Sequence, residues 1–267
     1  MLLQNAVRAS GTSTELGELH DADRPSSGAP VLPPLSISVV IPTKNEARNI
    51  AWVLEHMDPM VDEIVIVDGL STDNTVEVAR MVRPDIVAVH HPVPGKGEAV
   101  RAGLRAATGD IVVMMDADGS MDPVEIRRFV EAIASGYDFV KGSRFLEGGG
   151  TSDMTGLRRF GNFGLVTLSN LLLGAGHSEL CYGFMAFRRS RIEDLGLRST
   201  GFEIETEIVV RAHRMGLATA EVPSFEYPRR HGTSNLNTWR DGWRVLRTLV
   251  REWAARIPAP ATVPDES

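Results

Sequence analysis

Two carboxylates separated by one residue, in Asp116-Ala117-Asp118, come directly after the apolar run 111–115. Five consecutive apolar residues between polar ones predict a short strand that is buried on both faces. Adjacent carboxylates repel each other unless a cation lies between or beside them, and a divalent cation shared with a substrate phosphate is the usual solution. The triplet therefore predicts a metal-assisted phosphate site. The alternative interpretation is an acidic turn that caps a helix beginning near Pro123.

Three further polar segments follow apolar runs in the same way: Pro42-Thr43-Lys44-Asn45-Glu46, then Asp68 to Thr75, then Pro94-Gly95-Lys96-Gly97. Strands are predicted over 37–41, 63–68, 86–90 and 111–115, and helices over 47–57, 75–81 and 96–107. Short strands that alternate with helices indicate parallel βαβ units. Because the carboxyl ends of parallel strands lie at one edge of a sheet, where α/β proteins bind ligands, we expect all four segments to form one site.

Beyond residue 135 the pattern becomes less regular. Gly148 to Gly150 predict a mobile loop, and a long apolar segment runs over 155–173. A strand near 184–187, a helix over 203–215 and a strand over 218–222 follow. We therefore expect a single α/β domain over 36–256, with disordered tails at 1–35 and 257–267.

Two residues in the polar segments have specific expected roles. Asp68 can accept a hydrogen bond from a base or a ribose hydroxyl, or it can cap the following turn. Lys96, between two glycines, can approach a diphosphate, or it can lie solvated at a helix N-terminus. The sequence contains neither a Walker phosphate loop nor a Gly-x-Gly-x-x-Gly turn after a strand.

Taken together, the motifs resemble a known family. Four segments resemble the family-two inverting glycosyltransferases of the GT-A fold. They are Ile-Pro-Thr-Lys-Asn-Glu at 41–46, Val-Asp-Gly-Leu-Ser-Thr-Asp-Asn-Thr at 67–75, Gly-Lys-Gly at 95–97 and Met-Asp-Ala-Asp at 115–118. Three later segments are similar to the dolichol-phosphate mannosyltransferase-like branch: Gly-Ser-Arg-Phe at 142–145, Glu-Leu-Cys-Tyr-Gly-Phe-Met-Ala-Phe-Arg at 179–188, and Arg-Arg-His-Gly-Thr-Ser-Asn at 229–235. Each motif is degenerate, but their order and spacing are specific.

The resemblance implies an α/β GT-A fold, with a mostly parallel central sheet flanked by helices, and an enzyme that transfers a hexose-type sugar from a nucleoside diphosphate-sugar with inversion. It implies Mg²⁺ or Mn²⁺ on Asp116 and Asp118, where the ion stabilises charge on the leaving diphosphate. The implied donor-binding residues are Pro42, Thr43, Glu46, Asp68, Lys96, Asp116 and Ala117. The implied acceptor or phosphate residues are Arg144, Glu179, Arg229 and Ser234, and Asp118 and Arg229 are implied to be catalytic. A surface salt bridge is the alternative role of the two arginines.

Four positions depart from the family pattern, and one of them is Glu179, which replaces an aspartate. Gly69 stands where many members have a second aspartate, so base recognition rests on Asp68. Ser120 stands where the branch often has glutamine, which leaves the third metal ligand open. Asn235 replaces a lysine of the phosphate segment.

The acceptor decides whether a general base is needed. A phosphate acceptor is already ionised near neutral pH, whereas a hydroxyl acceptor must lose a proton. Among Glu203, Glu205 and Glu207 we favour Glu205 as a base or as a group that supports one, with solvated glutamates at a helix N-terminus as the alternative. We expect a polyprenyl (dolichyl-type) phosphate acceptor. The alternatives are a hydroxyl of a soluble sugar or natural product, or a catalytically degenerate sugar-nucleotide-binding protein.

The bulk composition is that of a globular protein. The chain has 267 residues, a net charge of −7 and 24% charged residues, which argues against nucleic-acid binding. Its one cysteine, Cys181, excludes an internal disulfide. The sequence contains no signal peptide and no apolar run long enough to span a membrane. These features predict a cytoplasmic protein.

The C-terminal segment indicates contact with a membrane surface. Large apolar residues recur there every three or four positions, so they form one helical stripe beside arginines with the same spacing. They are Trp239, Trp243, Leu246, Val250 and Trp253. An amphipathic helix of this kind suits an anionic bilayer surface. The alternative is that the stripe packs on the domain, and segment 160–173 can likewise lie at an interface or form core. We expect association with the cytoplasmic face of the membrane.

Overall fold

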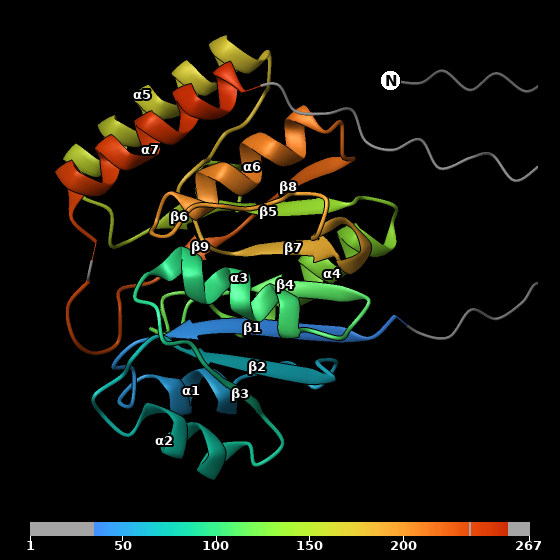
Figure 1. Cartoon of the computed structure of the whole chain (residues 1–267), viewed down its shortest axis with the longest axis vertical. Coiled ribbons are helices and arrows are strands. Elements are labelled where there is room, and N and C mark those ends of the chain that lie inside the picture. The colour runs from blue at the N-terminus through green and yellow to red at the C-terminus, as the bar shows by residue number, and fades with distance from the viewer. Residues whose placement is uncertain (1–34, 235, 256–267) are drawn as a thin grey trace, which may run out of the picture. The chain divides into compact units, whose positions relative to one another are not determined.

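The computed structural model describes residues 35–234 and 236–255, so nearly all of both predicted tails lies outside the described residues. The main sheet consists of β1 (Ile37–Thr43), β2 (Glu63–Asp68), β3 (Val87–His90), β4 (Ile111–Met114), β5 (Phe139–Ser143), β7 (Met185–Arg188) and β8 (Thr219–Pro223). Its seven strands lie in the order β3-β2-β1-β4-β7-β5-β8 (Figure 1). Only β7 runs antiparallel to its neighbours, β4 and β5. The predicted mostly parallel sheet is therefore confirmed.

The helices are α1 (Ile50–Glu55), α2 (Thr75–Val82), α3 (Lys96–Ala106), α4 (Ile126–Ala134), α5 (Gly156–Leu173), α6 (Ile204–Arg214) and α7 (Thr238–Ala254). α1, α2 and α4 pack on one face of the sheet, and α3 and α6 pack on the other (Figure 1). The two longest helices, α5 and α7, lie side by side and contact α6 from its outer side. The sheet is thus covered on both faces, as a mostly parallel sheet requires.

The apolar strands supply two cores, one on each face of the sheet. Alternate residues of β1 belong to different cores: Val39 and Ile41 lie with α1 and α4, whereas Val40 lies with α3. α3 approaches the sheet closely, since a Cβ atom added to Gly103 would be 2.4 Å from the Cγ1 atom of Val40. This tight packing fixes α3, whose first residue is Lys96, against the strands that end at the site.

β5 is a strand that the sequence pattern does not reveal. Its apolar run is interrupted by Lys141 and Gly142, so it does not read as a buried strand. In the fold, Lys141 is almost completely buried, and its ammonium group donates a hydrogen bond to the carbonyl of Tyr182 at 2.7 Å. The long side chain therefore satisfies a buried backbone acceptor within the core, which a periodicity argument cannot anticipate.

The prediction of a mobile loop over 148–150 is wrong for Gly150. Gly150 begins a short strand, β6 (Gly150–Thr151), which pairs in parallel with β9 (Phe225–Glu226). A Cβ atom on Gly150 would lie 2.7 Å from the ring of Phe225. Glycine here permits a close approach between two segments, which is its usual meaning within a strand.

The outward faces of α5 and α7 are apolar and exposed. On α7, Trp239 is 78% exposed, and Trp243, Val250 and Trp253 are exposed as well, whereas Leu246 is half-buried. Four of the five residues of the predicted stripe therefore do not pack on the domain. The exposed apolar side chains of α5 are Leu157, Phe160, Phe163 and Leu171. Within the described residues, the longest apolar stretch in any helix falls short of what a membrane crossing requires.

His177, shortly after α5, makes the stability of the fold depend on pH. Its ring meets that of His213 edge-on, with 5.5 Å between the ring centroids. Burial, assisted by the charges of His213 and Lys141, lowers the pKa of His177 from 6.5 to about 4. The unfolded chain therefore binds a proton between pH 6.5 and pH 4 that the folded chain does not. Stability should fall as the pH falls through this window, by on the order of 3 kcal/mol in total.

Urea unfolding at neutral pH and near the lower end of this window measures the effect. The variant His177→Asn removes the titrating ring, so its loss of stability between the two pH values should be smaller than that of the wild type by roughly 3 kcal/mol. An identical pH dependence in both proteins would show that His177 does not titrate in this way.

Candidate active site

The ends of β1, β2 and β4 meet the start of α3 at one edge of the sheet, as the sequence predicts (Figure 1). β1 and β2 end in register, with Thr43 beside Asp68. Asp116 and Asp118 follow the end of β4. Ala117 between them is buried and belongs to the apolar core. The triplet is therefore anchored by its central residue, and its two carboxylates remain at the sheet edge.

Asp116 forms a cluster with Lys96 and Glu205. The ammonium group of Lys96 lies 2.7 Å from one oxygen of Asp116 and 2.7 Å from one oxygen of Glu205. α3 contributes Lys96 and α6 contributes Glu205, so both helices on this face of the sheet converge here. Gly183 lies directly behind the cluster, because a Cβ atom there would be 3.1 Å from Glu205 and 3.2 Å from Lys96.

The cluster holds more negative than positive charge. Burial alone would lower the pKa of Lys96, but Asp116 and Glu205 outweigh it and raise that pKa. Burial also raises the pKa of Asp116 to about 6, against the attraction of Lys96 and with repulsion from Asp118 and Glu205. Two carboxylates thus share one ammonium group. An additional cation at Asp116 would relieve this imbalance.

Asp118 is held by a different cation, Arg229. The Nη1 atom of Arg229 lies 3.1 Å from Asp118, and its Nη2 atom donates a hydrogen bond to Glu46. Ser120 donates to Asp118 through its backbone N–H at 3.0 Å and its hydroxyl at 2.6 Å. Ser120, one of the departures from the family pattern, therefore orients the Asp118 carboxylate.

Glu46 links the end of β1 to the segment that carries Arg229. Burial raises the pKa of Glu46, although the hydrogen bond from Asn49 and the charge of Arg229 oppose this shift. Asn49 also donates to the carbonyl of His231 at 3.1 Å. The segment around Arg229 is consequently held at the site by polar contacts with Glu46 and Asn49 on one side and with Asp118 on the other.

A cavity of about 480 Å³ lies next to Arg229. Its lining residues are Trp52, Gly119, Asp122, Tyr227, Pro228, Arg229 and Arg230. The guanidinium of Arg230 stacks over the ring of Trp52, 4.1 Å from its centroid. The sequence alone does not single out Trp52 or Arg230, because a tryptophan in a helix and one arginine of a pair have no distinctive spacing.

Pro42, Thr43 and Asp68 stand together at the ends of β1 and β2. The hydroxyl of Thr43 donates to the carbonyl of Val67 at 3.2 Å. One oxygen of Asp68 accepts the N–H of Ser71 at 3.3 Å, so this carboxylate caps the following turn, as one of its two expected roles requires. Its other oxygen lies 3.5 Å from His90. The capping bond uses one oxygen only, which is compatible with a second bond to a ligand.

Arg144 and Glu179 form a separate buried cluster just beyond β5. The Nε atom of Arg144 lies 2.9 Å from Glu179, its Nη1 atom lies 2.9 Å from Glu226, and its Nη2 atom donates to the carbonyl of Cys181 at 3.1 Å. Burial opposes the charge of Arg144, but Glu179 and Glu226 outweigh burial and raise its pKa. Only 7% of the side chain is exposed. The alternative role of Arg144 as a surface salt bridge is therefore wrong.

A second cavity, of about 570 Å³, lies beside this cluster and along α5. Phe145 and Ser178, the chain neighbours of Arg144 and Glu179, line it. Its α5 residues are Gly156, Arg159, Phe160, Asn162, Phe163 and Val166. The guanidinium of Arg159 lies 5.9 Å from the ring centroid of Phe145, so a cation borders a mostly apolar lining. The sequence does not single out Arg159, since arginine is common at the start of any exposed helix.

Ser234, like Arg229, lies outside the Arg144 cluster. Its hydroxyl accepts the N–H of Leu236 at 3.2 Å. Among the residues that the structure describes, it has no hydrogen bond to the Arg144 cluster. It belongs instead to the segment that follows Arg229.

Asp116 and Asp118 offer the oxygen ligands that Mg²⁺ and Mn²⁺ bind. Within residues 35–234 and 236–255, no group of three or more acidic, histidine or cysteine side chains is arranged to hold a metal ion. Water and substrate oxygens would therefore complete the coordination, as is common for Mg²⁺. The donor atoms and the excess negative charge at Asp116 both fit a divalent cation.

The sequence profile of glycosyl transferase family 2 matches residues 38–196, more than half of the chain. The chain belongs to this family. A dolichyl-phosphate hexose transferase of Haloferax volcanii is 32% identical to this glycosyltransferase over 219 residues, which are 80% of this chain and 92% of the relative. The polyprenol monophosphomannose synthase of Mycolicibacterium smegmatis is 32% identical over 243 residues, 85% and 90% of the two chains. These relatives support the dolichol-phosphate mannosyltransferase-like branch.

Solved structures confirm the GT-A fold. The glucosyl-3-phosphoglycerate synthase from Mycobacterium tuberculosis, in complex with Mn²⁺, uridine diphosphate and phosphoglyceric acid, superimposes with a TM-score of 0.67 at 27% identity. The similarity covers 85% of this glycosyltransferase and 81% of that chain. The same synthase has also been crystallised with Mg²⁺ and uridine diphosphate.

Proposed function

We propose that this glycosyltransferase transfers a hexose with inversion from a nucleoside diphosphate-sugar to a polyprenyl phosphate, with Mg²⁺ or Mn²⁺ held by Asp116 and Asp118. The proposal rests on one observation. Two carboxylates at the end of β4 meet two cationic side chains, Lys96 and Arg229, at the ligand-binding edge of the sheet. The relatives named for dolichyl phosphate and polyprenol support the acceptor.

The donor side of the site matches a diphosphate. When bound, the divalent ion would supply a Lewis acid that stabilises negative charge on the leaving nucleoside diphosphate. Lys96 and Arg229 already contact the two carboxylates, so they can turn to the phosphate oxygens once those carboxylates have another partner. Pro42, Thr43, Glu46 and Asp68, at the ends of β1 and β2, would bind the nucleoside.

The acceptor side matches a lipid phosphate. The apolar walls of the cavity along α5 suit isoprene units, and Arg159 in its lining suits a phosphate. Arg144 is committed to Glu179 and Glu226, so it would shape the cavity wall. Since a phosphate acceptor is already ionised, Glu205 need not act as a base and would instead hold Lys96.

The outward faces of α5 and α7 suit a membrane that contains such a lipid. Aromatic side chains on both helices are exposed, namely Trp239 and Trp243 on α7, and Phe160 and Phe163 on α5, which also line the cavity. Paired amphipathic helices with aromatic residues on one side and arginines beside them can lie in the plane of an anionic bilayer surface. We therefore propose peripheral contact of these two helices with the membrane.

A transfer assay tests the proposal. The enzyme would be incubated with GDP-mannose or UDP-glucose, Mn²⁺ and a polyprenyl phosphate, with the lipid supplied in vesicles or in detergent. We expect a product that partitions into organic solvent, carries the inverted anomer, and requires the divalent ion. Nucleotide binding without transfer to any acceptor would favour the degenerate binding protein instead.

A soluble acceptor is the second candidate. The likeness to a synthase solved with phosphoglyceric acid supports it. The same assay separates the two, because transfer to phosphoglyceric acid or to a sugar hydroxyl leaves the label in the aqueous phase. A hydroxyl acceptor would also give Glu205 the role of general base.

A further inference from the structure

The loop of residues 198–201 lies directly against the turn that carries Lys96. The backbone N–H of Gly97 donates to the carbonyl of Thr200 at 3.0 Å. A Cβ atom on Gly95 would lie 2.1 Å from the Thr200 carbonyl oxygen, and one on Gly97 would lie 2.3 Å from that of Ser199. Only glycines allow this approach, so the position of the loop sets the position of the Gly95-Lys96-Gly97 turn.

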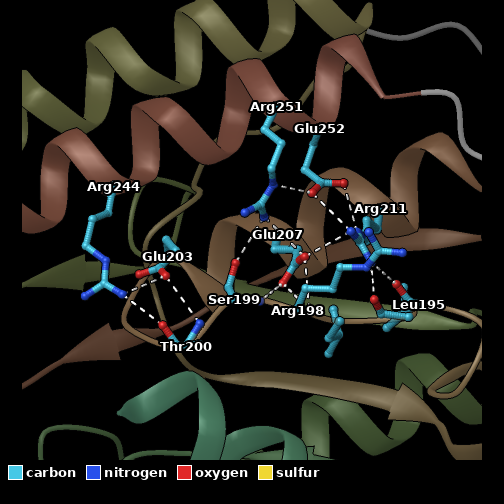
Figure 2. A network of polar contacts seen from close by, with 12 residues as sticks. Leu195, Arg198, Ser199, Thr200, Glu203, Glu207, Arg211, Arg244, Arg251 and Glu252 are labelled. Atoms are coloured by element: carbon cyan, nitrogen blue, oxygen red, sulfur yellow. Dashed lines mark hydrogen bonds and ion pairs between the residues drawn. The ribbon is translucent and has the colours of Figure 1, made fainter. Parts of the chain in front are cut away.

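Arg244 of α7 holds this loop in shape (Figure 2). Its Nη2 atom donates to the hydroxyl of Thr200 at 3.0 Å and to Glu203 at 3.1 Å. The same oxygen of Glu203 accepts the backbone N–H groups of Thr200 at 3.3 Å and Gly201 at 3.2 Å. Because Glu203 is buried, its negative charge depends on this arginine and on these N–H groups.

A second arginine of α7 secures the other end of the loop (Figure 2). Glu207 is fully buried and accepts the N–H groups of Arg198 at 3.0 Å and Ser199 at 2.7 Å. Arg251 lies 3.3 Å from Glu207 and 3.4 Å from the hydroxyl of Ser199. The loop is thus fixed to α7 at Ser199 and at Thr200.

The start of α6 contacts both the 198–201 loop and the ammonium group of Lys96. Glu203 and Glu205 are two residues apart, so they project in different directions. Glu203 meets Arg244 and the loop, whereas Glu205 lies 2.7 Å from the Lys96 ammonium group. Lys96 is therefore constrained from two sides, at its backbone by the loop and at its side chain by Glu205.

We propose that Arg244 is a positioning residue for the donor diphosphate. It holds the 198–201 loop against the Gly95-Lys96-Gly97 turn and thereby aims Lys96 at Asp116, although Arg244 itself touches neither. The diphosphate as the ligand of Lys96 rests on the proposed function, whereas the contact between loop and turn does not. Two measurements test the loop contact and the diphosphate ligand separately.

Amide hydrogen exchange tests the mechanical part. In Arg244→Gln the shorter side chain cannot bridge Thr200 and Glu203, so the Gly97 amide should exchange about tenfold faster than in the wild type. The matched control is Arg247→Gln, which removes the same charge from an exposed position of the same helix. Among the described residues, Arg247 takes part in no ion pair, so its variant should exchange like the wild type. Unchanged exchange at Gly97 in Arg244→Gln would overturn the inference whatever the enzyme transfers.

Calorimetric titration with Mn²⁺ and inorganic pyrophosphate tests the functional part without any assumption about the base or the sugar. Arg244→Gln should weaken pyrophosphate binding about tenfold, and Arg247→Gln should not. The double variant Lys96→Met/Arg244→Gln should bind no more weakly than Lys96→Met, because Arg244 acts through Lys96. Additive losses would refute this route. If the wild type does not bind pyrophosphate while Gly97 still loses protection, the donor-site proposal fails and the loop contact stands.

Discussion

Replacing Asp118 by asparagine should reduce sugar transfer by about a thousandfold without unfolding the enzyme. The substitution removes the charge that would hold the divalent ion and that now pairs with Arg229 at 3.1 Å. Asparagine keeps an oxygen that can accept both hydrogen bonds from Ser120. The site lies at the sheet edge, and Arg229 keeps its ion pair with Glu46, so the free energy of unfolding should fall by no more than about 2 kcal/mol.

The transfer assay and thermal unfolding, each with and without Mn²⁺, measure both parts of this expectation. Asp194→Asn removes the same charge from an exposed position and serves as the control. We expect Mn²⁺ with a nucleoside diphosphate to raise the melting temperature of the wild type and of the control, but not that of Asp118→Asn. Full activity in Asp118→Asn would remove Asp118 from the catalytic site, and an unfolded variant would mean that its role is structural.

The sequence was sufficient to locate the sheet edge of the site. Short, mostly apolar strands of four to seven residues end at or near Thr43, Asp68 and Asp116, and the geometry of parallel sheets brings their ends together. What it could not supply is the partner of each charge. Lys96 meets Glu205 across 109 residues of sequence, and Arg229 meets Glu46 across 183. No periodicity relates positions so far apart, since only the tertiary fold makes them neighbours.

The glutamates of α6 show the same limit within a single element. Helical geometry separates the direction of Glu205 from that of Glu203 and Glu207, and in the fold Glu205 is the one that meets Lys96, a contact that the sequence does not predict. The alternative of solvated glutamates is wrong, because all three are buried. Glu203 and Glu207 are buried beneath α7 and the 198–201 loop, whereas Glu205 is buried against Lys96 of α3. The sequence of α6 contains no information about any of these neighbours. The local pattern therefore gives relative directions, while the packing of other elements decides which direction is buried.

The outward stripe of α7 was ambiguous in the sequence for a related reason. An amphipathic pattern states that one face is apolar, but not whether a domain or another surface covers it. In the fold, α7 packs through the opposite set of residues, with Val245 and Leu249 buried while Trp239 and Trp243 are exposed. α7 thus contacts Glu203 and Glu207 through its arginines, while its tryptophan face is exposed.

Arg144→Ala should destabilise the fold by about 3–5 kcal/mol. Arg144 stands between Glu179, which is fully buried, and Glu226, each at 2.9 Å. Removal of the guanidinium leaves the buried Glu179 carboxylate with the N–H of Cys181 at 3.1 Å as its remaining hydrogen-bond donor among the described residues. Urea unfolding followed by tryptophan fluorescence gives the change directly. Arg159→Ala, which truncates an exposed arginine of the neighbouring cavity, should cost less than about 1 kcal/mol.

A double variant distinguishes an unpaired buried charge from simple loss of packing. If the cost of Arg144→Ala comes from Glu179, then adding Glu179→Gln should recover part of the stability, because an amide is much cheaper to bury than a carboxylate without a partner. If packing were the cause, the second substitution would add a further loss. Recovery of stability would establish that Arg144 neutralises the charge of Glu179. It would also mean that this ion pair supports the wall of the proposed acceptor cavity at Phe145 and Ser178. A further loss would mean that packing of Arg144 stabilises that wall, chiefly its contact with the ring of Tyr182. The guanidinium carbon of Arg144 lies 4.7 Å from the centroid of this ring.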